Sequence, residues 1–148
     1  MPSTVLAQLN IAKLLQPLES PQLKGFVDNL DRINAVAEQS KGFVWRLKSE
    51  DPDNANNAVL FGEDIIVNMS TWQSIEALHH FTYRSAHTEV LSRRKEWFSM
   101  LNTYSVLWWH PSAEPPTVAI AAKRLALLQE SGPTEEAFTF KTAWPRPD

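Results

Sequence analysis

Three of the chain's four histidines fall within nine residues, in the segment HHFTYRSAH that runs from His79 to His87. Imidazole nitrogens bind metals and haem iron, and a histidine with a pKa near neutrality can move a proton in catalysis. The same segment carries Phe81, Tyr83 and Arg84, which can contact an organic molecule through aromatic area and charge. The segment therefore allows a metal site, a haem site, a site for an organic ligand, or a helix that only packs.

A mononuclear metal site needs three or four converging ligands, often with histidines one helical turn apart. His80 and His87 are seven residues apart, so they share a helix face only if the helix is continuous. Glu76 precedes His80 by four residues, and this pair supplies two ligands only. The 148 residues include no cysteine, which excludes thiolate ligands, disulfides and a cysteine nucleophile. We expect no dedicated metal site.

A haem needs one axial histidine and an apolar slot, so the aromatic residues make haem binding feasible. His87 is the stronger candidate for the axial ligand, with His80 second. The alternative without a functional role is that His87 forms a hydrogen bond at a helix break near Ser85 and Ala86. The organic-ligand hypothesis uses the same histidine as an acid or base beside an aromatic pocket, with no cofactor.

The chain has six tryptophans, more than a small core needs, so we expect some of them to line a pocket or an interface. Small-molecule sites are mostly apolar and carry a few polar groups. The candidate catalytic residues are His87, Asn10 and Arg94, with Arg94 as a partner for an anion. The candidate ligand-binding residues are Trp45, Trp72, His80, Phe81, Tyr83, Trp97 and Trp109.

Alternating and helical spacings of apolar residues predict the elements that must position this site. Strands are expected over 5–15, 43–50, 64–69, 103–111 and 137–144. In the first strand Ala7 and Leu9 fall on one face and Gln8 and Asn10 on the other, and in the second Arg46 lies opposite the face of Phe43, Trp45 and Leu47. Helices are expected over 20–40, 70–101 and 115–132, the second of them broken near YRSAH. The segment 51–58 is expected to be a polar loop. Ser20 and Pro21 predict the start of the first helix, and Ser70 with Gln73 predicts a capping box for the second.

The order β-α-β-β-α-β, followed by a helix and a short strand, predicts an α+β fold of one domain over residues 1–148. It is the ferredoxin-like split βαβ arrangement, an antiparallel sheet with helices on one face. The other face would then expose Trp45 or Trp109, which monomers rarely tolerate. We therefore expect a homodimer in which two sheets pack face to face.

The totals exclude several classes of protein. The formal charge is −3, and the basic cluster RRK at 93–95 is followed at once by Glu96, so we expect no nucleic-acid partner. No apolar run approaches the ~20 residues that span a bilayer, and the N-terminus lacks the pattern of a secretory signal. We expect no membrane association and a cytoplasmic location. Four glycines cannot build a Gly-rich phosphate loop.

Several segments together resemble the DUF3291 family over nearly the whole chain: LNIAKL, GFVWRL, VNMSTWQSIEALHHFTYRSAHTEVLSRRKEWF, LWWHP and GPTEEAFTF. The run F-x-Y-x-x-x-H followed by R-x-x-WF is the most specific part. That family is similar to the dimeric α/β-barrel superfamily, which includes antibiotic-biosynthesis monooxygenases, haem-degrading monooxygenases, chlorite dismutase-like proteins and spheroidene monooxygenases. The resemblance implies a ferredoxin-like dimer, and such a fold hosts several chemistries.

The resemblance also implies roles for individual residues. Asn10 matches an asparagine on the first strand of haem-degrading members, and Trp72 matches the entry to the ligand-side helix of cofactor-free monooxygenases. His87 lies on the segment that carries the haem-ligating histidine in haem-binding members. The expected function is a cofactor-free oxygenase acting on an apolar or aromatic molecule. The alternatives are a haem-binding protein or haem-dependent monooxygenase, and a dimer that binds a ligand without catalysis.

Overall fold

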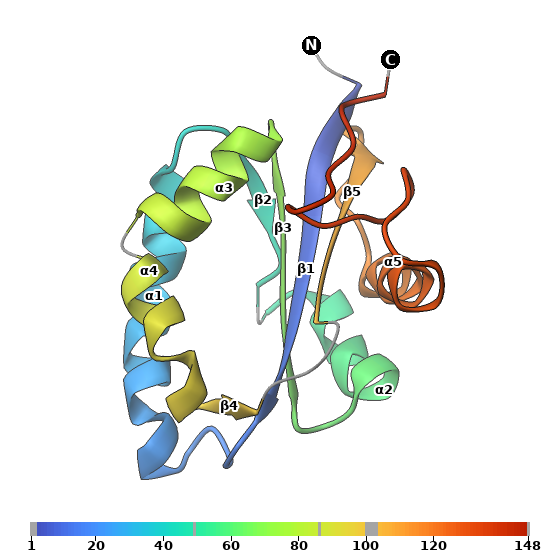
Figure 1. The fold of residues 1–148 in the computed structure, drawn as a ribbon. Coiled ribbons are helices and arrows are strands. Elements are labelled where there is room, and N and C mark those ends of the chain that lie inside the picture. The colour runs from blue at the N-terminus through green and yellow to red at the C-terminus, as the bar shows by residue number, and fades with distance from the viewer. Residues whose placement is uncertain (1–2, 49, 86, 100–103, 148) are drawn as a thin grey trace.

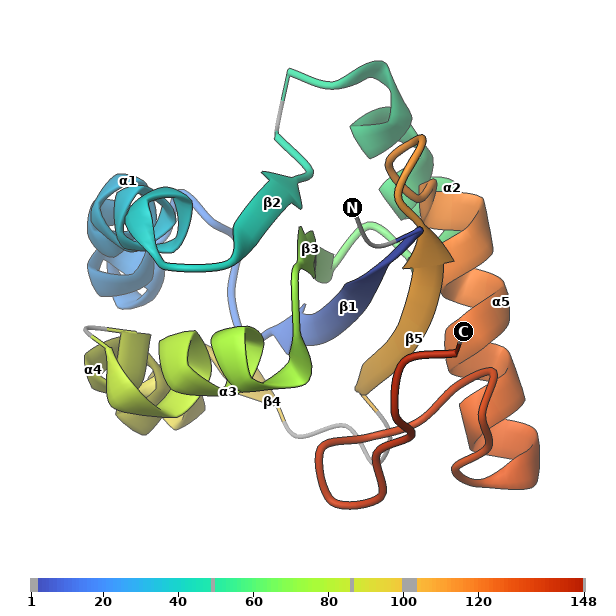
Figure 2. The same cartoon turned by 90° about the horizontal axis from the view of Figure 1, so that it is seen from above.

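The computed structural model describes residues 3–48, 50–85, 87–99 and 104–147. The architecture is α+β, as predicted: a curled antiparallel sheet forms a half-barrel, and helices lie against both of its faces (Figure 1). The view from above separates the same two helical layers (Figure 2). Among the ranges just given, no helix has the length and apolar character needed to cross a bilayer.

The sheet is built around the first strand. Strand β1 (Thr4–Leu14) pairs with β3 (Ile65–Trp72) along one side and with β5 (Ser105–Pro111) along the other. The short strand β2 (Phe43–Arg46) adds to the outer side of β3, and β4 (Phe98–Ser99) pairs with the end of β1. All of these pairs are antiparallel, so the alternation along β1 decides which side chains reach each helical layer.

One face of the sheet is covered by α5 (Val118–Ser131), beside which lies α2 (Asn57–Phe61). Helical spacing predicts an apolar stripe of Val118, Ala121, Leu125 and Leu128 along this helix, and the structure confirms it, because all four residues are buried on this face. Between α5 and the sheet lies a hydrophobic core cluster, which consists of Ala7, Leu9, Met69, Val106, Trp108, Val118, Ala121, Leu125, Leu128 and Ala137. The expectation that this face is left uncovered is therefore wrong, because the added helix folds back over it.

The other face lies under α1 (Lys24–Gln39), α3 (Ile75–Arg84) and α4 (His87–Ser92). The predicted break near YRSAH is confirmed, because α3 ends before Ser85 and α4 starts at His87. The helical region does not extend to residue 101 as expected. After α4 the chain forms a 3-10 turn, η3 (Arg94–Glu96), and then the short strand β4; residues 100–103 lie outside the described ranges.

Four local expectations differ from the structure. The first helix begins with a 3-10 turn, η1 (Pro21–Leu23), and Ser20 makes no side-chain cap there. The expected loop at 51–58 contains η2 (Pro52–Asn56) and α2. The strand expected over 43–50 ends at Arg46. The last strand is reduced to isolated bridges, in one of which Phe138 and Leu107 exchange backbone hydrogen bonds of 2.8 Å.

The predicted capping box is also misplaced. Ser70 and Trp72 belong to β3, and the residue that caps α3 is Ser74, whose Oγ accepts a hydrogen bond from the Ala77 amide at 3.1 Å. Both serines precede helical spacing, so the local pattern does not separate them. Ser70 is instead buried within the sheet, where its side chain has a different role.

Asp53 ties the 3-10 segment η2 to the first turn of α5. Its Oδ2 accepts a hydrogen bond of 2.6 Å from the amide of Val118. Replacing Asp53 by Ala should lower the free energy of unfolding by about 1 kcal/mol, the usual effect of losing a helix cap. Urea unfolding measures this. Asp53→Asn keeps an acceptor oxygen and should lose less, so equal losses for the two variants would show that the hydrogen bond is not the cause.

Candidate functional site

The sheet face beneath α1, α3 and α4 carries a band of polar side chains. In an antiparallel sheet, residues that pair across strands point to the same face. Register therefore defines two adjacent rows on this face, which together we call the polar band. One row is Arg46, Ser70 and Gln8, beyond which the buried, apolar Leu107 of β5 continues the row, and the next is Asn68, Asn10 and Ser105.

Apolar rows flank this polar band. On one side the paired residues Trp72 and Leu6 belong to a core cluster with Leu78 of α3. On the other side Ile66 pairs with Ala12. A sheet face under helices normally carries apolar side chains, because an unpaired buried polar group costs free energy. Polar groups in the middle of such a face are therefore unusual, and they define the candidate site.

Water reaches part of the polar band. The side chains of Asn10 and Asn68 are exposed although both lie on the face that looks toward the helices. Leu30, which belongs to the inward stripe of α1 with the buried Ile33 and Ala37, is 38% exposed. The helix layer thus does not seal this part of the sheet.

Hydrogen bonds within the polar band fix which atoms remain available. Gln8 Nε2 donates to Asn68 Oδ1 at 2.6 Å and to Ser70 Oγ at 2.7 Å. Trp72 Nε1 also donates to Ser70 Oγ, at 2.9 Å. A hydroxyl has two acceptor lone pairs and one donor, so the Ser70 O–H is left to donate. The Asn10 side chain forms no hydrogen bond to the part of the chain that the structure describes.

Three aromatic rings connect the sheet to the start of α4. Trp72 stacks on Phe81 of α3 with ring centroids 5.2 Å apart, and Phe81 lies against His87 at 5.0 Å. Trp72 is fully buried, whereas Phe81 and His87 are half-buried. The structure therefore brings together three of the predicted site residues. Asn10 shares the face of Trp72 but lies four residues along the sheet, about 13 Å at the usual strand rise.

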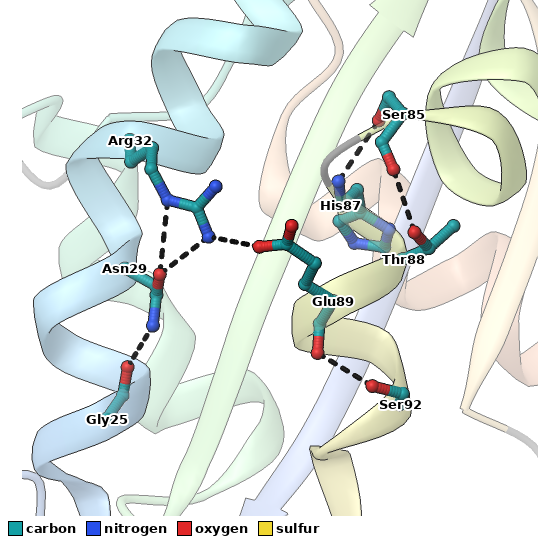
Figure 3. Close-up of polar contacts among 8 residues, drawn as sticks. All are labelled: Gly25, Asn29, Arg32, Ser85, His87, Thr88, Glu89 and Ser92. Carbon is teal, nitrogen blue, oxygen red and sulfur yellow. Dashed lines mark hydrogen bonds and ion pairs between the residues drawn. The ribbon is translucent and has the colours of Figure 1, made fainter.

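The helix break determines the state of His87. Its amide donates to Ser85 Oγ at 3.1 Å, and Thr88 Oγ1 donates to the Ser85 carbonyl (Figure 3). Its Nδ1 lies 3.1 Å from the carbonyl of Thr82, to which it must donate. The lone pair of the neutral ring is then on Nε2, which forms no hydrogen bond to the described residues. Burial lowers the pKa of His87 below its ordinary value, against the opposing effect of the Thr82 hydrogen bond.

The helix that carries His87 is joined to α1. Arg32 Nη2 of α1 donates to Glu89 Oε2 of α4 at 2.9 Å, and the same nitrogen donates to Asn29 Oδ1 at 2.8 Å (Figure 3). Both charged side chains are largely exposed, so this ion pair contributes little to stability. Its effect is positional, because it keeps α4 beside α1.

The lowered pKa of His87 predicts a loss of stability in acid. Below pH 6.5 the unfolded chain binds a proton that the folded chain resists. The free energy of unfolding should therefore have its full value above pH 6.5. It should fall as the pH drops from 6.5 through the lower pKa that His87 has in the folded protein. Urea unfolding between pH 5 and 7.5 should show a shallower slope for His87→Gln. A residual slope is expected from His110, whose pKa burial also lowers, whereas an unchanged slope would contradict the prediction.

His80 and Tyr83 lie on the outer side of α3. The two side chains are exposed, and Tyr83 contacts His79 and Phe140 rather than the polar band. A shallow surface hollow is lined by Ile75, Glu76, His79, His80 and Arg84. Over the described ranges, no three histidine, aspartate or glutamate side chains are close enough to hold a metal ion.

Two of the predicted tryptophans are used in packing. Trp97 is buried against Phe26 and Phe98. Trp109 donates its Nε1 to the Trp144 carbonyl at 2.9 Å, and the guanidinium of Arg146 lies 4.7 Å from the centre of its ring. Both contacts of Trp109 come from the C-terminal segment.

Trp45 and Arg94 also lie apart from the histidine. Trp45 pairs with Thr71 and packs into the cluster beneath α5, on the opposite face of the sheet. Arg94 begins η3 and is half-buried, and its side chain forms no ion pair or hydrogen bond with the described residues. The structure therefore does not join either residue to Trp72, Phe81 and His87.

Gln8, Arg46, Asn68 and Ser70 were not among the predicted site residues. Their signal was present, because each is a polar residue within a strand otherwise rich in apolar residues. Alternation assigned Gln8 and Arg46 to the face opposite the most apolar residues of their strands. It could not show that helices would lie over that face and make the polar residues unusual.

Comparisons with known proteins give a family model that matches the chain and solved structures that resemble it. The model of the family described as "Domain of unknown function (DUF3291)" matches residues 5–148. The crystal structure of PA3566 from Pseudomonas aeruginosa aligns with 12% identity and a TM-score of 0.48, covering 77% of this chain and 99% of that one. The NE2512 protein of unknown function from Nitrosomonas europaea aligns with 13% identity and a TM-score of 0.48, over 79% and 99%. No curated protein matches the chain.

Proposed function

This chain belongs to the DUF3291 family. From the geometry of its sheet, we propose that the protein is an oxygenase-type enzyme acting on a small apolar or aromatic molecule. The ligand would lie between the polar band and the layer of α1, α3 and α4. Phe81, which is half-buried and stacks on the fully buried Trp72, would contact its rings, and Asn10 would donate a hydrogen bond to it or to oxygen. The observation that carries the proposal is a solvent-accessible polar band on a sheet face that lies under helices.

His87 would act as the base. Its Nε2 bears the lone pair of a neutral ring, and burial lowers its pKa, so it is unprotonated at neutral pH. Removing a C–H proton from an anthrone leaves a carbanion, and removing the O–H proton from a phenol leaves a phenolate. Either anion reacts with oxygen directly. With an anthrone, the CH₂ carbon bonds to oxygen as a hydroperoxide. Loss of water then leaves a ketone, so one O₂ yields one carbonyl and one water, and no cofactor is needed.

A ferredoxin-like homodimer is the architecture we propose for this enzyme. The order β2-β3-β1-β5 across the sheet, with α1 and α3 on one face, supports the ferredoxin-like topology. The dimer cannot use the whole opposite face, because α5 covers it. Size-exclusion chromatography with light scattering at micromolar concentration tests the dimer, and a monomer mass would refute it.

Haem binding is the second candidate function, and the free Nε2 of His87 favours it. His87 would hold the haem iron through its free Nε2, and Phe81 would supply apolar contact. Bound haem would supply the activation of oxygen. Protein purified with haem supplied should then show a Soret band that His87→Ala removes. Without that band, the haem proposal fails.

Oxygen consumption with a panel of phenols and anthrones tests the main proposal. We expect uptake of oxygen that depends on both protein and substrate, with a ketone or quinone product identified by mass spectrometry. Ligands that raise the melting temperature without oxygen uptake would indicate a non-catalytic binding protein instead. If no member of the panel is consumed or bound, the proposal is refuted.

A further inference from the structure

We propose that Arg46 binds an anionic group on the ligand, a carboxylate or a phenolate, at the end of the polar band next to α1. This inference rests on the proposed function, because it names the chemistry of the molecule that the site would take. It assigns the anion-binding role to Arg46, on β2, rather than to Arg94. Four observations on Arg46 support it.

The first two observations concern how weakly the Arg46 guanidinium is paired. Its side chain is only 22% exposed, and its Nε is buried without a hydrogen-bond partner. Its Nη2 forms a long ion pair with Glu38 Oε1, which lies 3.8 Å away and beyond hydrogen-bond distance. Among the described residues the guanidinium forms no side-chain hydrogen bond and no second ion pair. An arginine has five N–H donors in a planar fork, so a largely buried one without hydrogen bonds lacks its expected partner.

The third observation is its position. Arg46 pairs with Ser70, and Ser70 pairs with Gln8, so Arg46 ends a row of the polar band. The Glu38 contact shows that the guanidinium lies on the side of α1, the same side as the ligand in our proposal. The fourth is the donor left over on Ser70, whose Oγ already accepts two hydrogen bonds. An anion here would face a guanidinium and a hydroxyl donor.

These donors select the class of ligand. Planar guanidinium binds carboxylates through two parallel hydrogen bonds, and charge-assisted hydrogen bonds are about twice as strong as neutral ones. The stacked Trp72 and Phe81 lie on the same side of the sheet and favour an aromatic body. The ligand inferred is therefore an aromatic acid, or a phenol in its ionised form. Glu38 would compete with it for the guanidinium.

A matched pair of probes tests this inference: 2-naphthoate, which is anionic, and 2-naphthamide, its neutral counterpart of similar shape. Isothermal titration calorimetry at low salt should show that the wild type binds naphthoate about 10- to 100-fold more tightly, the range for a hydrogen-bonded charge. Arg46→Gln should abolish this preference. Arg46→Lys should keep part of it, because the charge remains while the fork is lost.

Two further variants make the result specific. Glu38→Gln removes the competing carboxylate and should tighten naphthoate binding without changing naphthamide binding. Arg94→Gln should leave the preference unchanged. Equal binding of the two probes by wild type, or a preference that survives in Arg46→Gln, would overturn the inference and leave the proposed function standing. If wild type binds neither probe, the aromatic-ligand site itself is refuted, and the anion site with it.

Discussion

Replacing His87 by alanine is expected to lower the turnover number by about 10²- to 10⁴-fold, the usual contribution of a positioned general base. The reason is that Nε2 of His87 bears a lone pair that can accept a proton, and alanine has no such group. The Thr82 hydrogen bond holds the ring of His87 beside Phe81. Oxygen-electrode rates with an anthrone that wild type consumes measure the effect. The rate of wild type should fall in acid as His87 takes up a proton, at a pH below its ordinary value of 6.5.

The matched control is His80→Ala. His80 lies on the outer surface of α3, within the same segment, and its removal should leave the rate unchanged. Circular dichroism of both variants shows whether the fold is intact. If His87→Ala turns over at the wild-type rate, the histidine is not the base. An equal loss in both variants would point instead to damage to α3 and its connection to α4.

Replacing Trp72 by alanine should destabilise the protein by about 3–5 kcal/mol, the range for large aromatic residues removed from a core. Trp72 is fully buried, stacks on Phe81 at 5.2 Å and meets Phe43 edge-on at 5.4 Å. Its removal empties the point where β3, β2 and α3 meet. Urea unfolding followed by far-ultraviolet circular dichroism measures the change without relying on tryptophan fluorescence.

Trp72→Phe separates packing from hydrogen bonding. Phenylalanine keeps most of the ring contact but loses the Nε1 donor to Ser70, so we expect a smaller loss of about 1–2 kcal/mol. If Trp72→Ala and Trp72→Phe are equally unstable, the hydrogen bond rather than the packed volume holds this corner of the core.

Local sequence patterns predicted those features that depend on one helix or strand alone, and not on what packs against it. The stripe on α5 was predicted residue by residue, because helical spacing alone shows which side of a helix is apolar. The alternation of β1 likewise separated Ala7 and Leu9 from Gln8 and Asn10. Trp72, Phe81 and His87 were also all among the predicted site residues, although their mutual contact could not be read from spacing.

The remaining part of the site depends on which element covers which face. Alternation shows that a strand has two faces, but it does not show that α5 covers the apolar one and α1 overlooks the polar one. Arg46 therefore gave the impression of an ordinary surface arginine. Ser70 was misassigned for a related reason, because its role is set by Gln8, 62 residues away in the sequence.

The position of α5 changes how folding and association are related in this protein. In a barrel formed by two bare sheets, neither chain completes its core until it meets the other, so folding depends on protein concentration. Here the helix that follows the last strand supplies that cover within the same chain. One chain can then complete its own core by itself, and the association with a second copy that we propose would be a separate equilibrium, one that could be strengthened or weakened without unfolding either partner.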